Sequence, residues 1–455
     1  MSDENKKLED LAARREARRK RRIRNQILAY STVIILIVGL AAGIITVVNI
    51  ISKGRTEIPN QPGNAVEIVE SSKPVESTEA TEETQSTEVV ESSSEEVIET
   101  GPVELTYEQK LDQIVNAAIE VMPLEDKVAG LFMVTPELLT GVKPVTKAGD
   151  STKAALSKYA VGGLLYTSQN IKNKNSFMEM LSNTELYSKY PVFLAVEEEG
   201  GKVTQIANKN LGSKTDSAKE LAATGDTQKA YLAGISIGNY LKELGINMNL
   251  APVADLANVE KSIMEERSFG ADPETVAGFL SGEMKAFKEL GILPCVKHFP
   301  GMGSVTTDPA NGVAVSNRSE DDFWGSEFVL FQKLVDEKVP VIMVSNMAVP
   351  ALVGDNTPCV LSEKVVTGIL RGEMGYDGLV ITDMLSDKAI ADYHSADEAA
   401  ILALRAGCDM ILCPEDFEKA YNGVLKAVQD GTISQERIDD ALRRVYRIKF
   451  ADRVE

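Results

Sequence analysis

Short apolar runs alternate with longer amphipathic segments throughout residues 107–455. The runs are five to seven residues long, which is typical of buried strands in a parallel sheet, and the segments between them are long enough for helices. Eight such runs can be distinguished, at residues 128–134, 161–167, 192–196, 246–252, 291–297, 340–345, 378–382 and 409–414. The clearest helical segments between them are residues 219–244, 273–290, 321–337, 361–374 and 396–406.

This alternation predicts parallel β-α units and therefore an α/β fold. Eight units in about 350 residues indicate a TIM-type (β/α)8 barrel, which we assign to residues 105–455. A doubly wound open sheet is the alternative. It is disfavoured because no glycine-rich nucleotide-binding fingerprint opens a helix after the first strand.

A different pattern occupies the first 51 residues. Residues 27–51 form an uncharged, mostly apolar run of 25 residues that follows eight Lys and Arg residues between positions 14 and 24. Such a run spans the roughly 30 Å hydrocarbon core and exceeds the apolar region of a signal peptide. We therefore predict a basic cytoplasmic tail (1–26) and a single transmembrane helix in the lipid bilayer of the cell membrane (27–51), with the following chain extracytoplasmic. A cleaved signal peptide and a buried core helix are the alternatives.

Residues 52–104 are rich in Ser, Thr and Glu and contain no aromatic residue. Because such a segment cannot bury enough apolar surface to offset its chain entropy, we predict a disordered linker. Its 13 glutamates between residues 56 and 104 repel one another and should extend it, so that it acts as a spacer. A binding tail is the alternative interpretation.

Composition excludes several classes of function. The net charge is -20, which makes the protein repel nucleic acid, so no nucleic-acid partner is expected. The four cysteines have no C-x-x-C spacing and there are only two histidines, which argues against a disulfide scaffold or a zinc cluster. We expect no metal and no cofactor.

Polar residues gather where the apolar runs end. They are Glu197, Glu198, Glu199, Asp255, His298, Asn346 and Asp383. In a parallel barrel these positions share the carboxyl-end rim, which is where barrel active sites are built. Any one of these residues alone could be a solvated loop charge or a helix cap. Their recurrence at several strand ends favours a shared site.

Five strings carry a family resemblance: 296–303 (VKHFPGMG), 381–385 (ITDML), 266–273 (ERSFGADP), 249–255 (NLAPVAD) and 199–203 (EGGKV). Together they resemble the N-terminal barrel domain of family 3 glycoside hydrolases, in particular its single-domain bacterial β-N-acetylglucosaminidase (β-N-acetylhexosaminidase) branch. The resemblance covers about residues 107–450, with the strings in the expected order.

The resemblance implies a role for each matching residue. Asp383 matches the nucleophile that forms a glycosyl-enzyme intermediate. The residues that match sugar-binding positions are Glu197, Gln205, Arg267, Lys297 and His298, of which Glu197 replaces an aspartate and Gln205 an arginine. A purely structural alternative pairs Arg267 with Asp272 or Asp255.

The loop after residue 303 departs from the family pattern. The family's acid/base histidine follows an aspartate in a D-x-H arrangement; Asp308 matches the aspartate, but Ala310 occupies the histidine position. Met302 likewise replaces a histidine. General acid/base catalysis contributes about 10² to 10⁴-fold, so hydrolysis should slow unless another group substitutes. The candidates are Asp308, Glu197, Glu265, Glu266 and, more remotely, His394.

These observations predict a membrane-anchored, extracytoplasmic glycoside hydrolase that acts on a carbohydrate containing β-linked N-acetylhexosamine, such as a cell-wall glycan. The predicted mechanism is retaining, with Asp383 as nucleophile and Asp308 as a second catalytic residue. The first alternative is a sugar-binding pseudoenzyme on the same barrel. A lyase-like or phosphorylase-like activity on this scaffold is the second.

Overall fold

Nine short strands form one parallel sheet that curls into a nearly closed barrel in the computed structural model, which describes residues 105–454. The hydrogen-bonded order is β7-β6-β3-β2-β1-β11-β10-β9-β8. The strands are β1 (Phe132–Val134), β2 (Gly163–Leu165), β3 (Phe193–Val196), β6 (Met248–Asn249), β7 (Leu293–Pro294), β8 (Val296–Phe299), β9 (Val341–Val344), β10 (Leu379–Met384) and β11 (Met410–Leu412). A separate antiparallel hairpin pairs β4 (Glu198–Gly200) with β5 (Val203–Thr204).

The predicted eight-stranded barrel is wrong in its strand count. Each of the eight apolar runs overlaps a strand, but the run 291–297 is interrupted at Cys295 and overlaps both β7 and β8. The first part pairs with β6 and the second with β9, so the two strands lie at opposite ends of the hydrogen-bonded order. Between them the Cys295 N–H donates to the carbonyls of Asn249 (3.0 Å) and Ala251 (2.9 Å), and this local pairing replaces a regular ladder.

The predicted fold also included a transmembrane helix, and the part of the chain that the structure describes contains none. Among residues 105–454, no helix is both long enough and apolar enough to cross a bilayer. The tail (1–26), the apolar run (27–51) and the linker (52–104) lie outside the described residues. The extracytoplasmic location therefore stays a prediction from the sequence.

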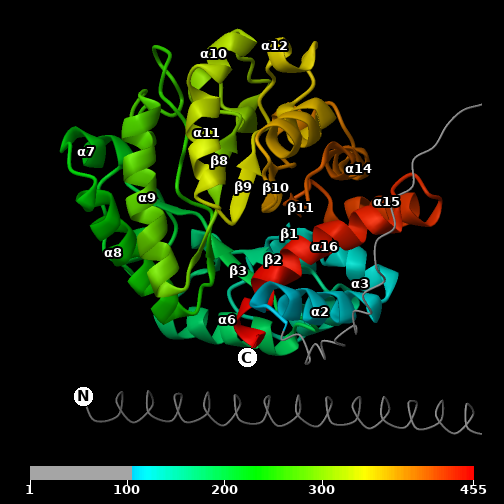
Figure 1. Ribbon diagram of the computed structural model, residues 1–455. Helices are drawn as coiled ribbons and strands as arrows, with labels where there is room; N and C mark the ends of the chain where they lie inside the picture. Colours follow the sequence, from blue (N-terminus) through cyan, green and yellow to red (C-terminus); the bar gives the residue numbers. More distant parts are fainter. Residues whose placement is uncertain (1–104, 455) are drawn as a thin grey trace, which may run out of the picture. The chain divides into compact units, whose positions relative to one another are not determined.

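Helices surround the strands, with α8 and α9 on one side of the barrel and α14, α15 and α16 on another (Figure 1). The α-helices are α2 (Tyr107–Glu120), α3 (Leu124–Ala129), α4 (Pro136–Thr140), α5 (Asp150–Lys158), α6 (Lys174–Tyr187), α7 (Ala218–Ala223), α8 (Gln228–Leu244), α9 (Pro273–Leu290), α10 (Glu320–Trp324), α11 (Glu327–Asp336), α12 (Pro350–Val353), α13 (Lys388–Ala391), α14 (Ala396–Ala406), α15 (Phe417–Gln429) and α16 (Gln435–Lys449). A π-helix, η6 (Lys364–Glu373), replaces the α-helix expected at residues 361–374. Short 3₁₀ turns include η3 (Met302–Ser304) and η4 (Pro309–Asn311).

Local sequence signals explain why the bounds of α9 agree with the prediction. The helix starts after Asp272, whose side chain accepts a hydrogen bond from the N–H of Thr275, and Pro273 occupies the first helical position. It ends at Gly291, whose φ of 74° is the left-handed conformation that glycine adopts readily. In contrast, the expected helix 219–244 is split into α7 and α8 by a turn at Gly225 (φ 66°).

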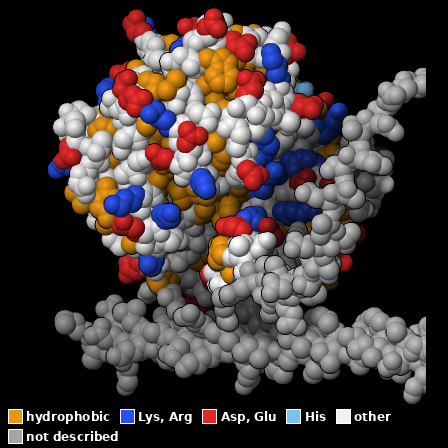
Figure 2. Space-filling model, viewed as in Figure 1, with side chains coloured by type: hydrophobic (Ala, Val, Ile, Leu, Met, Phe, Trp, Pro, Cys, Tyr) orange, Lys and Arg blue, Asp and Glu red, His pale blue; other side chains and the backbone are white. Residues whose placement is uncertain are grey.

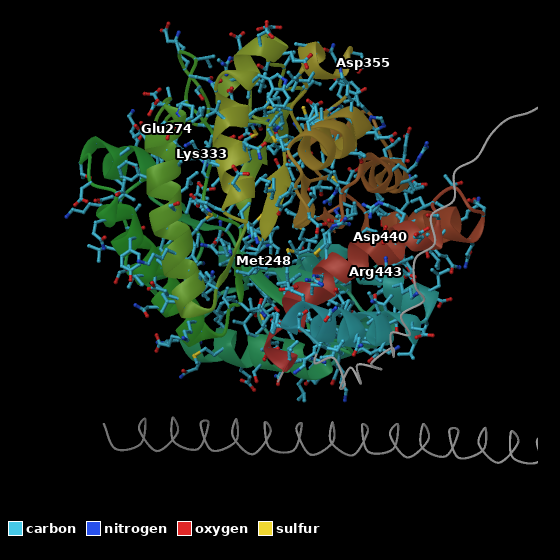
Figure 3. All side chains as sticks on the ribbon, viewed as in Figure 1. Met248, Glu274, Lys333, Asp355, Asp440 and Arg443 are labelled. Carbon is cyan, nitrogen blue, oxygen red and sulfur yellow. The ribbon has the colours of Figure 1, made fainter. Side chains whose placement is uncertain are left out.

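Two apolar cores hold the barrel together. The inner core fills the barrel and includes Met133, Leu165, Met248, Met343 and Met410, all fully buried or nearly so; Met248 lies among the strands in Figure 3. A much larger outer core packs the helices against the outside of the strands. The sheet is therefore buried on both faces, as expected for apolar strand runs without alternation.

Acidic and basic side chains are interspersed over the face of the domain seen in Figure 2. Several form ion pairs between neighbouring helices. Lys333 of α11 and Glu274 of α9, for example, lie 2.8 Å apart (Nζ to Oε2), and both are labelled in Figure 3. Such exposed pairs contribute about 0–1 kcal/mol each, so the cores supply most of the stability.

Candidate functional site

A buried ionic cluster lies at the carboxyl-end rim of the barrel. Lys297, on β8, is fully buried, and its Nζ contacts Glu197 Oε1 at 2.5 Å and Glu199 Oε1 at 2.6 Å. Arg267 binds Glu199 through two parallel hydrogen bonds, Nε to Oε2 at 2.9 Å and Nη2 to Oε1 at 2.6 Å. The predicted residues Glu197, Arg267 and Lys297 are thus brought together, and Arg267 pairs with neither Asp272 nor Asp255 as the structural alternative required.

Glu199 and Lys297 are both charged, because the neighbouring opposite charges affect their pKa values more than burial does. Burial alone would raise the pKa of Glu199, but the adjacent Lys297 and Arg267 cations lower it to about 2. Burial would likewise lower the pKa of Lys297, and the Glu197 and Glu199 carboxylates raise it instead. The two acids and two bases therefore hold one another in fixed positions.

His298 is held in place by Asp255. The histidine Nδ1 lies 2.6 Å from Asp255 Oδ2, and both side chains are buried. Asp255 Oδ1 also accepts hydrogen bonds from the backbone N–H groups of His298 (3.3 Å) and Met302 (2.5 Å). One carboxylate therefore fixes both the imidazole ring and the start of the loop that follows β8.

Asp383 lies near the end of β10, on the same rim. Its Oδ1 accepts a hydrogen bond from the N–H of Met384 at 2.8 Å. Burial raises the pKa of Asp383, while the nearby His298 and Lys297 act in the opposite direction. The carboxyl group is thus close enough to both predicted sugar-binding bases to be influenced by their charge.

Asn346 and Asp387 adjoin Asp383. Asn346 follows β9, and its Nδ2 donates to the carbonyl of Met384 (2.7 Å) and to Asp387 Oδ2 (2.9 Å). Asp387 stands directly before α13 and is half-buried. Its pKa is raised to about 7, first by burial and then by the negative charge of Asp383.

Two predicted residues make local contacts instead of joining the ionic cluster. Gln205 Oε1 accepts a hydrogen bond from the N–H of Ser168 at 2.9 Å. Asp308 is exposed, and its Oδ1 accepts a hydrogen bond from the N–H of Ala310 at 3.0 Å, which caps η4. The roles implied for both residues stay predictions.

Three other candidate acids are also engaged elsewhere. Glu265 and Glu266 both pair with Lys219 at 2.8 Å on the surface. His394 lines a different cavity, together with Glu415, Asp416 and Lys419. None of the three contacts Asp383 in the structure.

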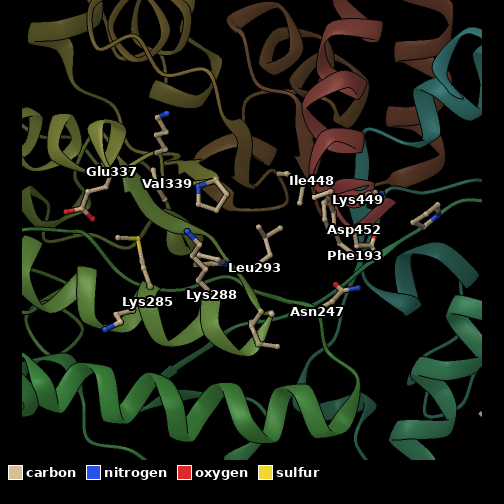
Figure 4. A pocket seen from close by; sticks show the side chains of 18 of the residues that line it. Phe193, Asn247, Lys285, Lys288, Leu293, Glu337, Val339, Ile448, Lys449 and Asp452 are labelled. Atoms are coloured by element: carbon tan, nitrogen blue, oxygen red, sulfur yellow. The ribbon is translucent and has the colours of Figure 1, made fainter. Parts of the chain in front are cut away.

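A cavity of about 570 Å³ opens beside the ionic cluster. It is lined by Glu199, Arg267 and Asp308 together with the hairpin glycines Gly200 and Gly201. A larger cavity of about 870 Å³ lies at the opposite end of the barrel, where β3, β7 and β9 begin. Figure 4 shows that larger cavity with Phe193, Leu293 and Lys449 around it; it contains none of the predicted site residues.

Sequence reasoning placed Glu199 at the rim without a role and missed Asp387. Glu199 belongs to the string 199–203 that carried part of the resemblance, but no role was assigned to it. Asp387 lies four residues after Asp383, at a position that looks like an ordinary helix cap. The only signal for Asp387 in the sequence was its position four residues after the predicted nucleophile Asp383. Among residues 105–454 no group of three or more His, Cys, Asp or Glu side chains is arranged to hold a metal ion.

The geometry agrees with a comparison to known families. Residues 123–448 match the model of the glycosyl hydrolase family 3 N terminal domain. The chain belongs to glycosyl hydrolase family 3. The resemblance drawn from the five strings is thereby confirmed.

Relatives within the family are named as hexosaminidases. The chain is 30% identical over 334 residues to Beta-hexosaminidase LpqI of Mycobacterium tuberculosis, a match that covers 71% of this chain and 82% of that protein. It is 28% identical over 326 residues to Beta-hexosaminidase A of Pseudoalteromonas piscicida, covering 65% of this chain and 54% of the relative. The chain thus spans about half the length of that relative.

Solved structures of the family have the same fold. A glycoside hydrolase family 3 beta-N-acetylglucosaminidase from Paenibacillus sp. strain FPU-7 superimposes with a TM-score of 0.69 at 30% identity, covering 73% of this chain and 63% of that one. The structure of M. tuberculosis LpqI gives a TM-score of 0.65 at 29% identity, covering 73% and 95%.

Proposed function

We propose that this chain is a retaining glycoside hydrolase that removes β-linked N-acetylhexosamine from a glycan, with Asp383 as its nucleophile. The observation that carries the proposal is the position of Asp383 at the end of β10, since β9 pairs with both β10 and the strand β8 that carries Lys297 and His298. The charges of Lys297 and His298 lower the pKa of Asp383 against the effect of burial. The names of the relatives, Beta-hexosaminidase and beta-N-acetylglucosaminidase, support the choice of sugar.

The ionic cluster has the chemistry of a sugar-binding subsite. Glu199 is only 7% exposed and is occupied by Lys297 and Arg267, so it serves to position them. Glu197 is 28% exposed and keeps an open side, where it can accept hydrogen bonds from sugar hydroxyls. Binding through fixed groups of this kind holds the sugar in one orientation relative to Asp383, which lowers the entropic cost of reaction.

The proposed reaction has two steps. In the first, a carboxylate oxygen of Asp383 forms a bond to the anomeric carbon while the bond to the leaving oxygen breaks. In the second, water attacks the same carbon and releases Asp383. Each step inverts the anomeric centre, so the sugar is released with its original configuration.

A sugar-binding protein without turnover is the second candidate. The observation that favours it is Ala310, which carries a methyl group where the family resemblance places a proton-transferring histidine, next to an Asp308 that is exposed and caps η4. The two candidates differ in whether a glycosidic bond is cleaved.

The deciding experiment uses the purified full-length chain and 2,4-dinitrophenyl N-acetyl-β-glucosaminide, whose leaving group departs without protonation. The hydrolase proposal predicts turnover that falls to the buffer background in Asp383→Asn and persists in the control Asp392→Asn, which changes an exposed aspartate beyond α13. Equal rates in wild type and Asp383→Asn would refute the proposal. N-acetylglucosamine binding by calorimetry in the absence of turnover would then support the second candidate.

A further inference from the structure

We propose that Asp387 transfers the proton in both steps, first as general acid toward the leaving oxygen and then as general base toward water. The inference rests on the proposed hydrolase function. It assigns the missing acid/base role to the residue that directly precedes α13, not to the loop that carries Asp308 and Ala310.

The carboxyl group of Asp387 is hydrogen-bonded to Asn346 and does not cap α13. Asp387 occupies the N-cap position of α13 but forms no side-chain hydrogen bond to the backbone of that helix. Its Oδ2 instead accepts the hydrogen bond from Asn346, whose Nδ2 also donates to the Met384 carbonyl. Asn346 therefore ties the Asp387 carboxyl to the strand end that carries Asp383.

The surroundings of Asp387 include the turn where the histidine is replaced. Helix α13 packs against η4, the turn that contains Ala310. Asp308, at the start of η4, is the other carboxyl there, but it is exposed and bonded to a backbone N–H. Asp387 is the more buried of the two acids, and it reaches the same region from the neighbouring element.

The electrostatic environment supports proton transfer at neutral pH. Burial and the negative charges of Asp383 on β10 and Asp308 beside η4 raise the pKa of Asp387 to about 7, while Asn346 and His298 on β8 lower it. A carboxyl with a pKa near the working pH is populated in both forms, as a group that must donate and then accept a proton requires. An unperturbed aspartate, with a pKa near 3.8, would be ionised before the first step.

The proton balance closes over the cycle. In the first step the Asp387 O–H gives its proton to the leaving oxygen, and the products are the alcohol, the glycosyl ester of Asp383 and the Asp387 carboxylate. In the second, water bonds to the anomeric carbon and gives one proton to Asp387, while the ester bond to Asp383 breaks. Asp387 returns to its protonated form and Asp383 to its carboxylate.

The test compares two substrates that differ only in the leaving group, phenyl and 2,4-dinitrophenyl N-acetyl-β-glucosaminide, with full-length Asp387→Asn. The amide keeps an oxygen that can accept the Asn346 hydrogen bond but has no proton to transfer. For the phenyl substrate we expect kcat/KM to fall by about 10² to 10⁴-fold, the usual contribution of an acid/base residue. For the dinitrophenyl substrate kcat/KM should change by less than about tenfold, since that leaving group needs no proton.

Azide provides a readout that a structural role would not produce. It attacks the glycosyl-enzyme without a proton acceptor, displaces the Asp383 carboxylate and forms a β-glycosyl azide. We expect azide to raise kcat of Asp387→Asn on the dinitrophenyl substrate, where the second step is impaired, and to leave the wild type and the Asp392→Asn control unchanged. The thermal unfolding midpoint of each variant checks that the fold is retained.

The outcomes separate this inference from the proposed function. No turnover of the dinitrophenyl substrate by the wild type refutes both. If the wild type turns over the substrate and the ratio of kcat/KM for the phenyl and dinitrophenyl substrates is the same in Asp387→Asn as in the wild type, only the role of Asp387 is refuted. The same holds if Asp308→Asn, and not Asp387→Asn, shows the leaving-group dependence and the azide effect. If Asp387→Asn does not fold, the wild-type pH profile decides. In that profile, kcat/KM for the phenyl substrate must decline above about pH 7 and kcat/KM for the dinitrophenyl substrate must not.

Discussion

Lys297→Met would remove a cation that lies fully buried between two carboxylates. The methionine side chain has a similar length, so the main change is electrostatic: Glu197 and Glu199 lose the Nζ contacts at 2.5 Å and 2.6 Å. Removing one partner of a buried pair typically costs about 3–5 kcal/mol because the remaining charge is left uncompensated. Arg267 still pairs with Glu199, so we expect the lower end, a loss of about 3 kcal/mol in the free energy of unfolding.

The pKa of Glu199 gives the magnitude for both cations together, of which Lys297 makes the largest favourable contribution. It lies at about 2 in the folded chain against an ordinary value of 4.5, and at about 1.4 kcal/mol per pKa unit this difference is worth about 3 kcal/mol. Because the folded-state pKa is lowered, this stabilisation is complete above about pH 4.5 and is lost as the pH falls toward 2. The penalty of Lys297→Met should therefore be about 1 kcal/mol smaller at pH 3.5 than at pH 7.

Urea unfolding at the two pH values measures both quantities. The control is Lys333→Met, which removes the exposed Lys333–Glu274 pair and should cost about 1 kcal/mol or less at either pH. A loss below about 1 kcal/mol for Lys297→Met at pH 7, or a loss that does not change at pH 3.5, would show that the cluster is not the buried network described above.

Two further changes test the loop after β8. Asp255→Asn should lower kcat/KM on the dinitrophenyl substrate about 10- to 100-fold, because a charged hydrogen bond to His298 worth about 1.5–3 kcal/mol is weakened; an unchanged kcat/KM would contradict this. Gly303→Ala should lower the free energy of unfolding by at least about 2 kcal/mol, since the added Cβ would lie 1.8 Å from the Leu256 carbonyl oxygen. Gly149→Ala, where the nearest atom is 3.8 Å away, is the matched control, and equal losses in chemical denaturation would refute the packing argument.

Much of the fold could be predicted because local signals and the global fold agree. Apolar runs of strand length recur between segments of helical period, and caps such as Asp272 and Gly291 mark where α9 begins and ends. The interruption at Cys295 could not be predicted in this way. It depends on which neighbours the two halves of the run 291–297 find, β6 for one and β9 for the other, and that choice is made by tertiary packing.

The site was predicted where residues follow strands, and missed where contacts between separate elements decide. Glu197 directly follows β3 and Lys297 lies on β8, and the barrel brings both to one rim, so their meeting follows from topology. For Asp387 the sequence permits either a helix cap or a group directed at Asp383. Only the packing of α13 against η4 and the hydrogen bond from Asn346 to Asp387 distinguish the two.

The arrangement of charge explains how the rim can hold several carboxyl groups in different protonation states. Near Lys297 and Arg267 the pKa of Glu199 is lowered, so this acid is a permanent anion that fixes the bases. Away from those cations, at Asp387, burial and two neighbouring carboxylates raise the pKa to about 7. One group is thereby suited to positioning and the other to proton transfer, because Glu199 contacts the two cations Arg267 and Lys297, whereas Asp387 accepts a hydrogen bond from the neutral amide of Asn346.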